Sequence, residues 1–298
     1  MAFNLYFAGS RVKDGDDYID EKGYLRLFSY LHEKRYIQQR ADKGLKTFVD
    51  SGAFSAHTKG AEIDADEYIA YVNEMDEHIS IFAQLDKIPG HFGKPKTKEQ
   101  LLEAPLMSDQ NYLYMVERVK SPDKLLPIYH QGEDFKHLKV MLEERPKIKY
   151  LGISPANDVT TSSKAKWIDE CFKVIKASSR PDIKTHAFGM TSLKVLERFP
   201  FYSADSTTWI MTAANGNIIT DYGTLVISDK MKREPKHILN MPKTWQKKFV
   251  EEVESKGFDL QLLSEDYKQR ILWNVRFLAN WAENYEYKPL KVKQNKLF

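Results

Sequence analysis

The sequence predicts a (β/α)8 barrel, or TIM barrel, an α/β fold, with extra helices at its C-terminal end. Short apolar segments alternate with segments of helical periodicity from Asn4 to Ile227, and this alternation is typical of a parallel sheet. Most of the apolar segments run directly into a polar, chemically useful residue. A (β/α)8 barrel gathers such residues at the carboxyl ends of its strands, where they form one active site. An open, doubly wound sheet is the alternative architecture.

Length and composition fit one such barrel. The chain has 298 residues, 42% of them hydrophobic, which is enough for a large core, and a barrel takes about 250 residues. The net charge of +3 is small, so any nucleic-acid surface has to be a local patch. Neither a signal-peptide pattern nor an apolar run of membrane-spanning length is present, so we expect a cytoplasmic protein without membrane contact.

Eight strands are expected, each a short apolar run bounded by turn residues or by helical periodicity. They cover residues 4–8, 46–49, 79–85, 126–129, 150–153, 184–188, 201–204 and 224–227. Helices are expected at 24–42, 64–75, 108–120, 135–144, 162–177 and 192–198. Asp64 is a suitable N-cap for the second of these helices, and the acidic segment 14–21 is expected to be a solvated loop.

The predicted barrel domain covers residues 1–230 and is the catalytic domain. Residues 231–298 are expected to form a helical extension, with helices at 245–255 and 264–281 and a basic tail from 288. A loop at 90–98 carries Lys94, Lys96 and Lys98. These lysines suit either phosphate contacts or a solvated surface, and both interpretations stay open.

Three of the expected strands end at aspartates, namely Asp50, Asp86 and Asp205. A single aspartate at a strand end is often only a helix cap or a turn former. Three of them at the strand ends of one barrel favour a shared site. Two facing carboxylates suit nucleophilic or acid–base chemistry at the anomeric carbon of a sugar.

Aromatic residues near the same strand ends suggest a slot for a planar base. Phe54, Tyr129 and Phe188 can each be core residues, but together with polar groups at Gln131 and Gly152 they would enclose a nucleobase.

A metal site is not expected. His130 directly follows one expected strand and His186 lies near the end of another, but no HxH or HExxH spacing supports metal binding. Cys171 is the only cysteine, which excludes an intrachain disulfide and a cysteine-rich zinc site, and it is expected to be a core thiol. No other cofactor is predicted.

The run Asp50-Ser51-Gly52-Ala53-Phe54 resembles the Asp-Ser-Gly-Gly-aromatic motif of the tRNA-guanine transglycosylases, whose fold is a (β/α)8 barrel. Further matches follow in the family's order and bring the similarity to about residues 3–225. They are Asp86, Gln131-Gly132, Gly152-Ile153-Ser154, Phe188-Gly189 and Asp205.

The resemblance implies a role for each matching residue. Asp205 is implied to be the nucleophile and Asp50 the group that moves the proton. Asp86 is implied to bind guanine N1–H and the 2-amino group. The remaining substrate-binding residues implied in this way are Ser51, Phe54, His130, Gln131, Gly152, Ser154, His186, Phe188 and Gly189.

The chain departs from the tRNA enzymes in two ways. They carry a Cys-x-Cys-x2-Cys…His zinc site, which a chain with one cysteine cannot build, and Ala53 and Ser55 replace a glycine and a glutamine of the motif. The chain is therefore more similar to the DpdA-like 7-deazaguanine DNA transglycosylases of phages and bacteria, without a zinc subdomain.

The expected function is exchange of guanine in DNA for a free 7-deazaguanine base, such as 7-cyano-7-deazaguanine. The same exchange on tRNA is the first alternative. A non-catalytic nucleic-acid-binding relative is another, against which the presence of both Asp50 and Asp205 speaks. A glycoside hydrolase is a further alternative. It would normally offer Glu as well as Asp at strand ends, whereas Asp50 and Asp205 stand without a Glu. The oligomeric state is left open.

Overall fold

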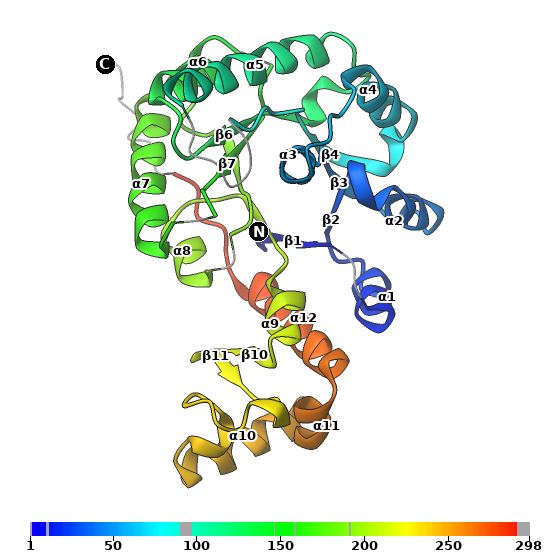
Figure 1. The fold of residues 1–298 in the computed structure, drawn as a ribbon, viewed down its shortest axis with the longest axis vertical. Helices are drawn as coiled ribbons and strands as arrows, with labels where there is room; N and C mark the ends of the chain where they lie inside the picture. Colours follow the sequence, from blue (N-terminus) through cyan, green and yellow to red (C-terminus); the bar gives the residue numbers. More distant parts are fainter. Residues whose placement is uncertain are drawn as a thin grey trace, which may run out of the picture.

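A computed structural model describes residues 2–9, 12–89, 97–145, 147–157, 159–190 and 192–290. At its centre lies one parallel sheet in the order β5-β4-β3-β2-β1-β9-β8-β7-β6. β5 (Leu125–Leu126) and β6 (Ile128–His130) are separated only by Pro127, which has no N–H to donate to a neighbouring strand. They are two parts of one extended stretch, so the sheet closes into the predicted (β/α)8 barrel (Figure 1).

Seven of the eight predicted strands lie in this barrel. Besides the divided stretch β5 and β6, they are β1 (Asn4–Ala8), β3 (Thr47–Asp50), β4 (Ile79–Ala83), β7 (Tyr150–Ser154), β8 (Lys184–Ala187) and β9 (Ser203–Ser206). The parallel register places Tyr6 of β1 beside Asp205 of β9, and His130 of β6 beside Ser154 of β7. Their carboxyl ends therefore meet at one mouth.

The remaining barrel strand, β2 (Arg26–Ser29), was expected to be part of a helix, and that prediction was wrong. Helix α2 begins only at Tyr30 and runs to Asp42. Leu27 packs inside the barrel whereas Phe28 packs against the helical layer, as strand alternation requires. A four-residue strand that runs directly into a helix leaves too little period-two pattern to stand out from the helical one.

The expected eighth strand, residues 224–227, was also misplaced. β11 (Gly223–Val226) pairs antiparallel with β10 (Asn217–Thr220), outside the barrel. Local composition indicates that a segment is extended, but not which strand it pairs with.

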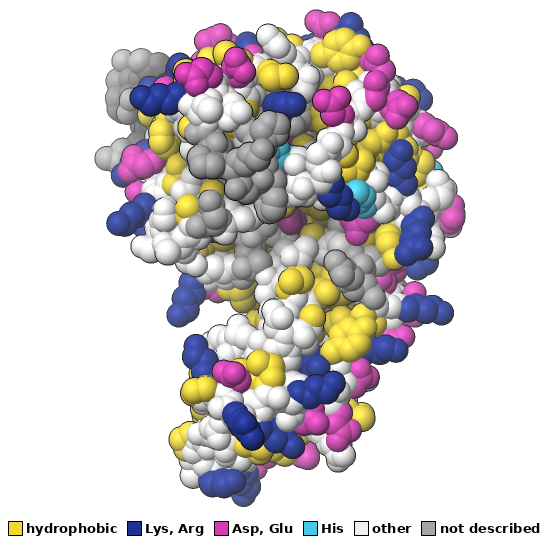
Figure 2. All heavy atoms as spheres, in the orientation of Figure 1, with side chains coloured by type: hydrophobic (Ala, Val, Ile, Leu, Met, Phe, Trp, Pro, Cys, Tyr) yellow, Lys and Arg dark blue, Asp and Glu magenta, His cyan; other side chains and the backbone are white. Residues whose placement is uncertain are grey.

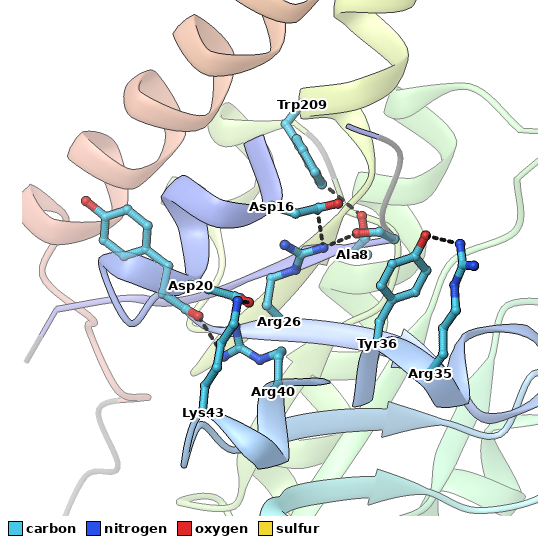
Figure 3. A network of polar contacts seen from close by, with 11 residues as sticks. Ala8, Asp16, Asp20, Arg26, Arg35, Tyr36, Arg40, Lys43 and Trp209 are labelled. Carbon is cyan, nitrogen blue, oxygen red and sulfur yellow. Dashed lines mark hydrogen bonds and ion pairs between the residues drawn. The ribbon is translucent and has the colours of Figure 1, made fainter. Parts of the chain in front are cut away.

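The acidic segment expected to be a solvated loop is helix α1 (Lys13–Glu21). Its carboxylates pair with guanidinium groups buried under the helix (Figure 3): Asp16 with Arg26 at 2.8 Å, and Asp20 with Arg40. Ile19 is fully buried. Asp16 and Asp20 thus neutralise two buried arginines, because a buried charge is stable only when it is paired.

In the described ranges, eight further helices surround or flank the barrel. Asp64 caps α4 as predicted, accepting a hydrogen bond from the backbone N–H of Glu67. These helices are α3 (Ala53–Lys59), α4 (Ala65–Glu74), α5 (Lys98–Val116), α6 (Phe135–Glu143), α7 (Thr161–Ala177), α8 (Leu193–Arg198), α9 (Thr208–Ala214) and α12 (Tyr267–Asn284). Cys171 is buried in α7, as expected of a core thiol.

The C-terminal elements form a lobe beside the barrel (Figure 1). The β10–β11 hairpin, α10 (Lys243–Ser255) and α11 (Leu260–Glu265) share a second apolar cluster with members from Ile218 to Trp273. Helix α12 returns to the barrel core. Its buried Asn274 joins the two parts, since it accepts from Ile219 N–H at 2.8 Å and donates to the Trp209 carbonyl at 3.3 Å. The division expected after residue 230 stays a prediction.

Candidate active site

Three carboxylates occupy the carboxyl ends of β3, β4 and β9. Asp50 is the last residue of β3, Asp86 follows β4, and Asp205 lies within β9. Asp86 and Asp205 are both buried. The negative charges of both act on the Asp50 carboxyl group, so the structure brings the three predicted aspartates into one electrostatic site.

Asp50 is held by the turn that follows it. Gly52 has a left-handed backbone (φ 84°) and donates its N–H to Asp50 Oδ2 at 3.0 Å. A Cβ atom on this glycine would lie 2.7 Å from Leu31 Cβ and from Ser29 Oγ, so the turn needs glycine. Burial, followed by the charge of Asp86, raises the pKa of Asp50 to about 7. The carboxyl group can therefore hold or release a proton near neutral pH.

Asp86 belongs to a polar network that includes two other predicted residues. His130 Nε2 lies 2.8 Å from Asp86 Oδ2, and the buried Ser51 hydroxyl lies 3.4 Å from Oδ1. Ser51 Oγ also accepts from Ala53 N–H at 3.3 Å. Asp86 is thus oriented by groups from two neighbouring strand ends, with one oxygen already engaged by a histidine.

Asp205 receives two hydrogen bonds on one oxygen. Gly189 N–H donates to Oδ1 at 2.9 Å, and His186 Nε2 lies 3.2 Å from the same atom. His186 is completely buried. Both predicted residues therefore contact the predicted nucleophile itself.

The aromatic residues divide between the mouth and the core. Phe188 packs against the Phe48 and His186 rings, with centroid separations of 5.9 and 4.6 Å. A Cβ atom on Gly152 would lie 2.6 Å from the Phe188 ring, so Gly152 makes room for it. Phe54, at the start of α3, is 51% exposed, so its ring face is available to a ligand.

Tyr129 cannot stack on a substrate base, and that prediction was wrong. It is fully buried and stacks on Trp167 at 5.7 Å. Its side chain belongs to the main core cluster between the barrel and the helices. In a strand that alternates between two buried faces, an aromatic residue next to the strand end need not face the barrel interior.

Gln131 and Ser154 form part of the rim. Gln131 N–H donates to the Ser154 carbonyl at 2.9 Å, and Gln131 Oε1 accepts from Ala156 N–H at 3.1 Å. Gln131 also lines a hollow of about 440 Å³ beside α6 and α7, with Phe135 and Trp167. Within the described part of the chain, neither residue forms a hydrogen bond with the three carboxylates.

Glu133 is a site residue that the sequence analysis missed. Burial raises its pKa to about 7, His130 opposes this shift, and the charge of Asp86 adds to it. Its backbone N–H donates to the His130 carbonyl at 3.2 Å. Its position directly after the predicted site residues Gln131-Gly132 could have identified it from the sequence. It also supplies the glutamate at a strand end that a glycoside hydrolase would use, which the sequence analysis found lacking.

Gln84 was also overlooked as a possible site residue. It is completely buried two residues before Asp86, and neither atom of its carboxamide has a hydrogen-bond partner among the described residues. A buried amide without partners is rare.

Several expected features fall outside the described residues, namely Lys94, Lys96 and the part of the basic tail beyond residue 290. Lys98 is the exposed first residue of α5. Among the residues that the structure describes, no group of three or more His, Cys, Asp or Glu side chains is placed to hold a metal ion. No helix in these ranges combines the length and apolarity needed to cross a bilayer.

The chain is similar to solved structures that have low sequence identity to it. KGPDC from Streptococcus mutans has a TM-score of 0.42 and 8% identity, over 70% of this chain and 90% of that one. N-acetylneuraminate lyase from Mycoplasma synoviae has a TM-score of 0.45 and 12% identity, over 98% and 93%. At these scores the likeness carries no argument about activity. No protein-family model matches the chain, and no curated protein matches it.

Proposed function

We propose that this protein is a glycosyltransferase that exchanges guanine in DNA for a free 7-deazaguanine base through a covalent glycosyl–enzyme intermediate. One observation carries the proposal: three carboxylates meet at the barrel mouth in three different environments. Asp205 has one oxygen bound by two donors, Asp86 is engaged by His130, and the pKa of Asp50 is raised to about 7. Base exchange needs a nucleophile, a base-binding group and a group that moves a proton.

The first half of the reaction forms the intermediate. The Asp205 carboxylate attacks C1′ of the target nucleotide, and a C1′–O bond forms as the bond from C1′ to guanine N9 breaks. The electron pair of that bond goes to the leaving base, which takes the proton of Asp50. Because the pKa of Asp50 is about 7, much of the protein carries this proton at neutral pH.

The second half returns the enzyme to its starting state. The Asp50 carboxylate removes the N9 proton of the incoming 7-deazaguanine, and N9 displaces Asp205 from C1′. One carboxyl group thus serves as acid and then as base, as a pKa near the working pH allows. The pocket holds the two bases in turn, so the kinetics are ping-pong.

The base is held by groups around Asp86. Asp86 accepts hydrogen bonds from N1–H and the 2-amino group of guanine, while Phe188 and the exposed Phe54 ring cover its faces. Extruding a nucleotide from a duplex costs a few kcal/mol, and stacking in the pocket offsets part of this. The contact between His130 and Asp86 Oδ2 keeps the carboxylate oriented before the base enters.

A basic surface on the C-terminal lobe supports a nucleic-acid partner. Residues 229–248 contain seven basic side chains and two acidic ones. All seven are exposed, and none forms an ion pair with another described residue. We call these residues the basic surface: Lys230, Lys232, Arg233, Lys236, Lys243, Lys247 and Lys248. Figure 2 shows Lys and Arg side chains over this lobe.

The basic surface has one part in residues 230–236 and another in α10, and the structure holds these two parts together. Gln246 of α10 donates to the carbonyls of Leu239 and Met241, at 3.1 and 2.7 Å, which fixes the preceding loop against the helix. The hairpin tip contacts the same helix, since the Tyr222 ring, 79% exposed, lies 6.1 Å from that of Trp245. Unpaired cations beside an exposed aromatic ring suit a phosphate backbone with accessible bases.

The test is base exchange with labelled guanine and three acceptors: duplex DNA, single-stranded DNA and unmodified tRNA. The proposal expects label in DNA, and a protein–DNA adduct that survives denaturant. If only tRNA becomes labelled, the substrate is tRNA and not DNA, and the proposed chemistry of Asp205 and Asp50 still stands. Release of guanine by hydrolysis without exchange would favour a glycoside hydrolase, with Glu133 as a candidate acid. Binding without either reaction would indicate a non-catalytic relative.

A further inference from the structure

A chain of buried side chains runs from the barrel interior to Asp205. The Tyr150 hydroxyl contacts Ser203 Oγ, which in turn contacts His186 Nδ1. His186 Nε2 lies 3.2 Å from Asp205 Oδ1. The four residues come from the adjacent strands β7, β8 and β9, and Ser203 and His186 are completely buried.

The chemistry of these side chains determines which group donates and which accepts in each of the three contacts. A carboxylate oxygen only accepts, so His186 Nε2 carries the hydrogen that faces Asp205. In the neutral ring Nδ1 then accepts from the Ser203 hydroxyl, and Ser203 Oγ accepts from the Tyr150 phenol. Burial raises the pKa of Tyr150 well above its usual value, so the phenol remains a donor. The hydrogen bond at one ring nitrogen thereby selects the tautomer at the other.

Aromatic packing holds the His186 ring in this orientation. The rings of Phe188, Phe48 and Tyr6 surround it, with centroid separations of 4.6, 4.9 and 5.8 Å. A rotation of the ring would exchange Nδ1 and Nε2 for carbon atoms and break both hydrogen bonds. The imidazole is therefore held by contacts on its edges and its faces.

The two oxygens of Asp205 differ as a result. Oδ1 accepts from both Gly189 N–H and His186 Nε2, whereas no described residue donates to Oδ2. We infer that Tyr150, Ser203 and His186 position Asp205 so that Oδ2 is the oxygen that attacks C1′, an inference that rests on the proposed function. His186 acts through Asp205 and is a positioning residue.

The balance of the step agrees with this assignment. Oδ2 forms the bond to C1′ while the C1′–N9 bond breaks, and Oδ1 becomes the carbonyl oxygen of the ester. Its two hydrogen bonds persist in the intermediate, because an ester carbonyl still accepts. The chain moves no proton, so Tyr150, Ser203 and His186 are chemically unchanged after each turnover.

The test compares three substitutions with a matched control. His186→Ala is expected to slow formation of the denaturant-stable adduct about 100-fold, the scale of a misplacement by about 1 Å. His186→Gln, which keeps a donor for Oδ1, should recover about ten-fold of that loss. Ser203→Ala removes the partner of Nδ1 without touching Asp205 and should slow the adduct about ten-fold. Affinity for DNA should stay within about two-fold throughout.

Thr185→Val is the control. Thr185 is buried in the same strand as His186, its hydroxyl has no hydrogen-bond partner among the described residues, and valine has nearly its shape. The adduct rate of this variant should equal that of the wild type. A thermal melt of each variant separates slow chemistry from loss of the fold.

A second measurement does not depend on activity. The ¹⁵N NMR shifts of the His186 ring should show a protonated Nε2 and an unprotonated Nδ1 acceptor, and Ser203→Ala should move the Nδ1 shift. If the wild type forms no adduct, the proposed function fails and the attack by Oδ2 fails with it. If the wild type forms the adduct and His186→Ala forms it at the same rate, only the positioning inference is overturned.

Discussion

Replacing Asp50 by asparagine is expected to stabilise the protein at alkaline pH while it removes turnover. The pKa of this carboxyl group rises from 3.8 to about 7 in the folded protein. Between these values the folded state holds a proton that the unfolded state has lost, so stability falls as the pH rises. Asparagine does not titrate, and its side-chain oxygen still accepts from Gly52.

The size of the effect follows from the two pKa values. Linkage over the range from pH 5 to pH 8 gives at most about 2–3 kcal/mol for one group with this shift. Asp50 keeps some access to solvent, so the observed value should lie below this limit. The difference in unfolding free energy between Asp50→Asn and the wild type should therefore grow with pH in favour of the variant.

Urea denaturation of both proteins at pH 5 and pH 8 measures this difference. Glu133 also has a pKa raised to about 7, but it is present in both proteins and cancels in the comparison. Exchange by Asp50→Asn should drop by about 10²-fold or more, the scale of a lost acid–base group. A stability difference that is the same at both pH values would refute the shifted pKa. Full turnover in the variant would show that another group moves the proton.

Three further predictions concern the nucleophile, the lobe and the nucleic-acid surface. Asp205→Ala should abolish both exchange and the adduct on a denaturing gel, and an adduct of undiminished yield would exclude Asp205 as the nucleophile. Asn274→Ala should lower the unfolding free energy by about 1–3 kcal/mol, because it leaves Ile219 N–H buried without a partner; Asn284→Ala, at an exposed position of the same helix, should change it little. A triple alanine substitution in the basic surface should weaken DNA binding and make the log–log salt slope shallower by up to about 0.9 per lost phosphate contact. An equal effect from a triple alanine substitution on the barrel, in α6 and in the segment that precedes β7, would contradict a specific role of the lobe. The lobe triple is Lys232, Arg233 and Lys236, and the barrel triple is Lys139, Lys147 and Lys149.

Much of the barrel could be predicted from the sequence because its strands are buried on both faces. Such strands appear as short apolar runs, and the helices between them show their own periodicity. Seven strands, the cap at Asp64 and the burial of Cys171 follow from these local patterns. The three aspartates were found for the same reason, since a polar residue directly after a buried strand is visible without knowledge of the fold.

Other parts depended on contacts between distant segments. β2 contains Arg26, a charge that a buried strand accommodates only because Asp16 of α1 lies 2.8 Å away. Residues 224–227 were correctly expected to be extended, but pairing with β10 instead of a barrel strand depends on the second apolar cluster. The local sequence of β2 or of residues 224–227 does not reveal these partners, because the partners lie in other segments of the chain.

The chemistry of the site was the least accessible to sequence analysis. The sequence identified Asp50, Asp86 and Asp205, but not that Asp50 titrates near pH 7 or that both donors to Asp205 bind the same oxygen. A pKa depends on desolvation and on neighbouring charges, and here those charges lie 36 and 155 positions away along the chain. The sequence by itself determines which carboxylates follow which strands. The different proton affinities of these carboxylates arise only when the closed barrel removes water from around them and brings their charges together.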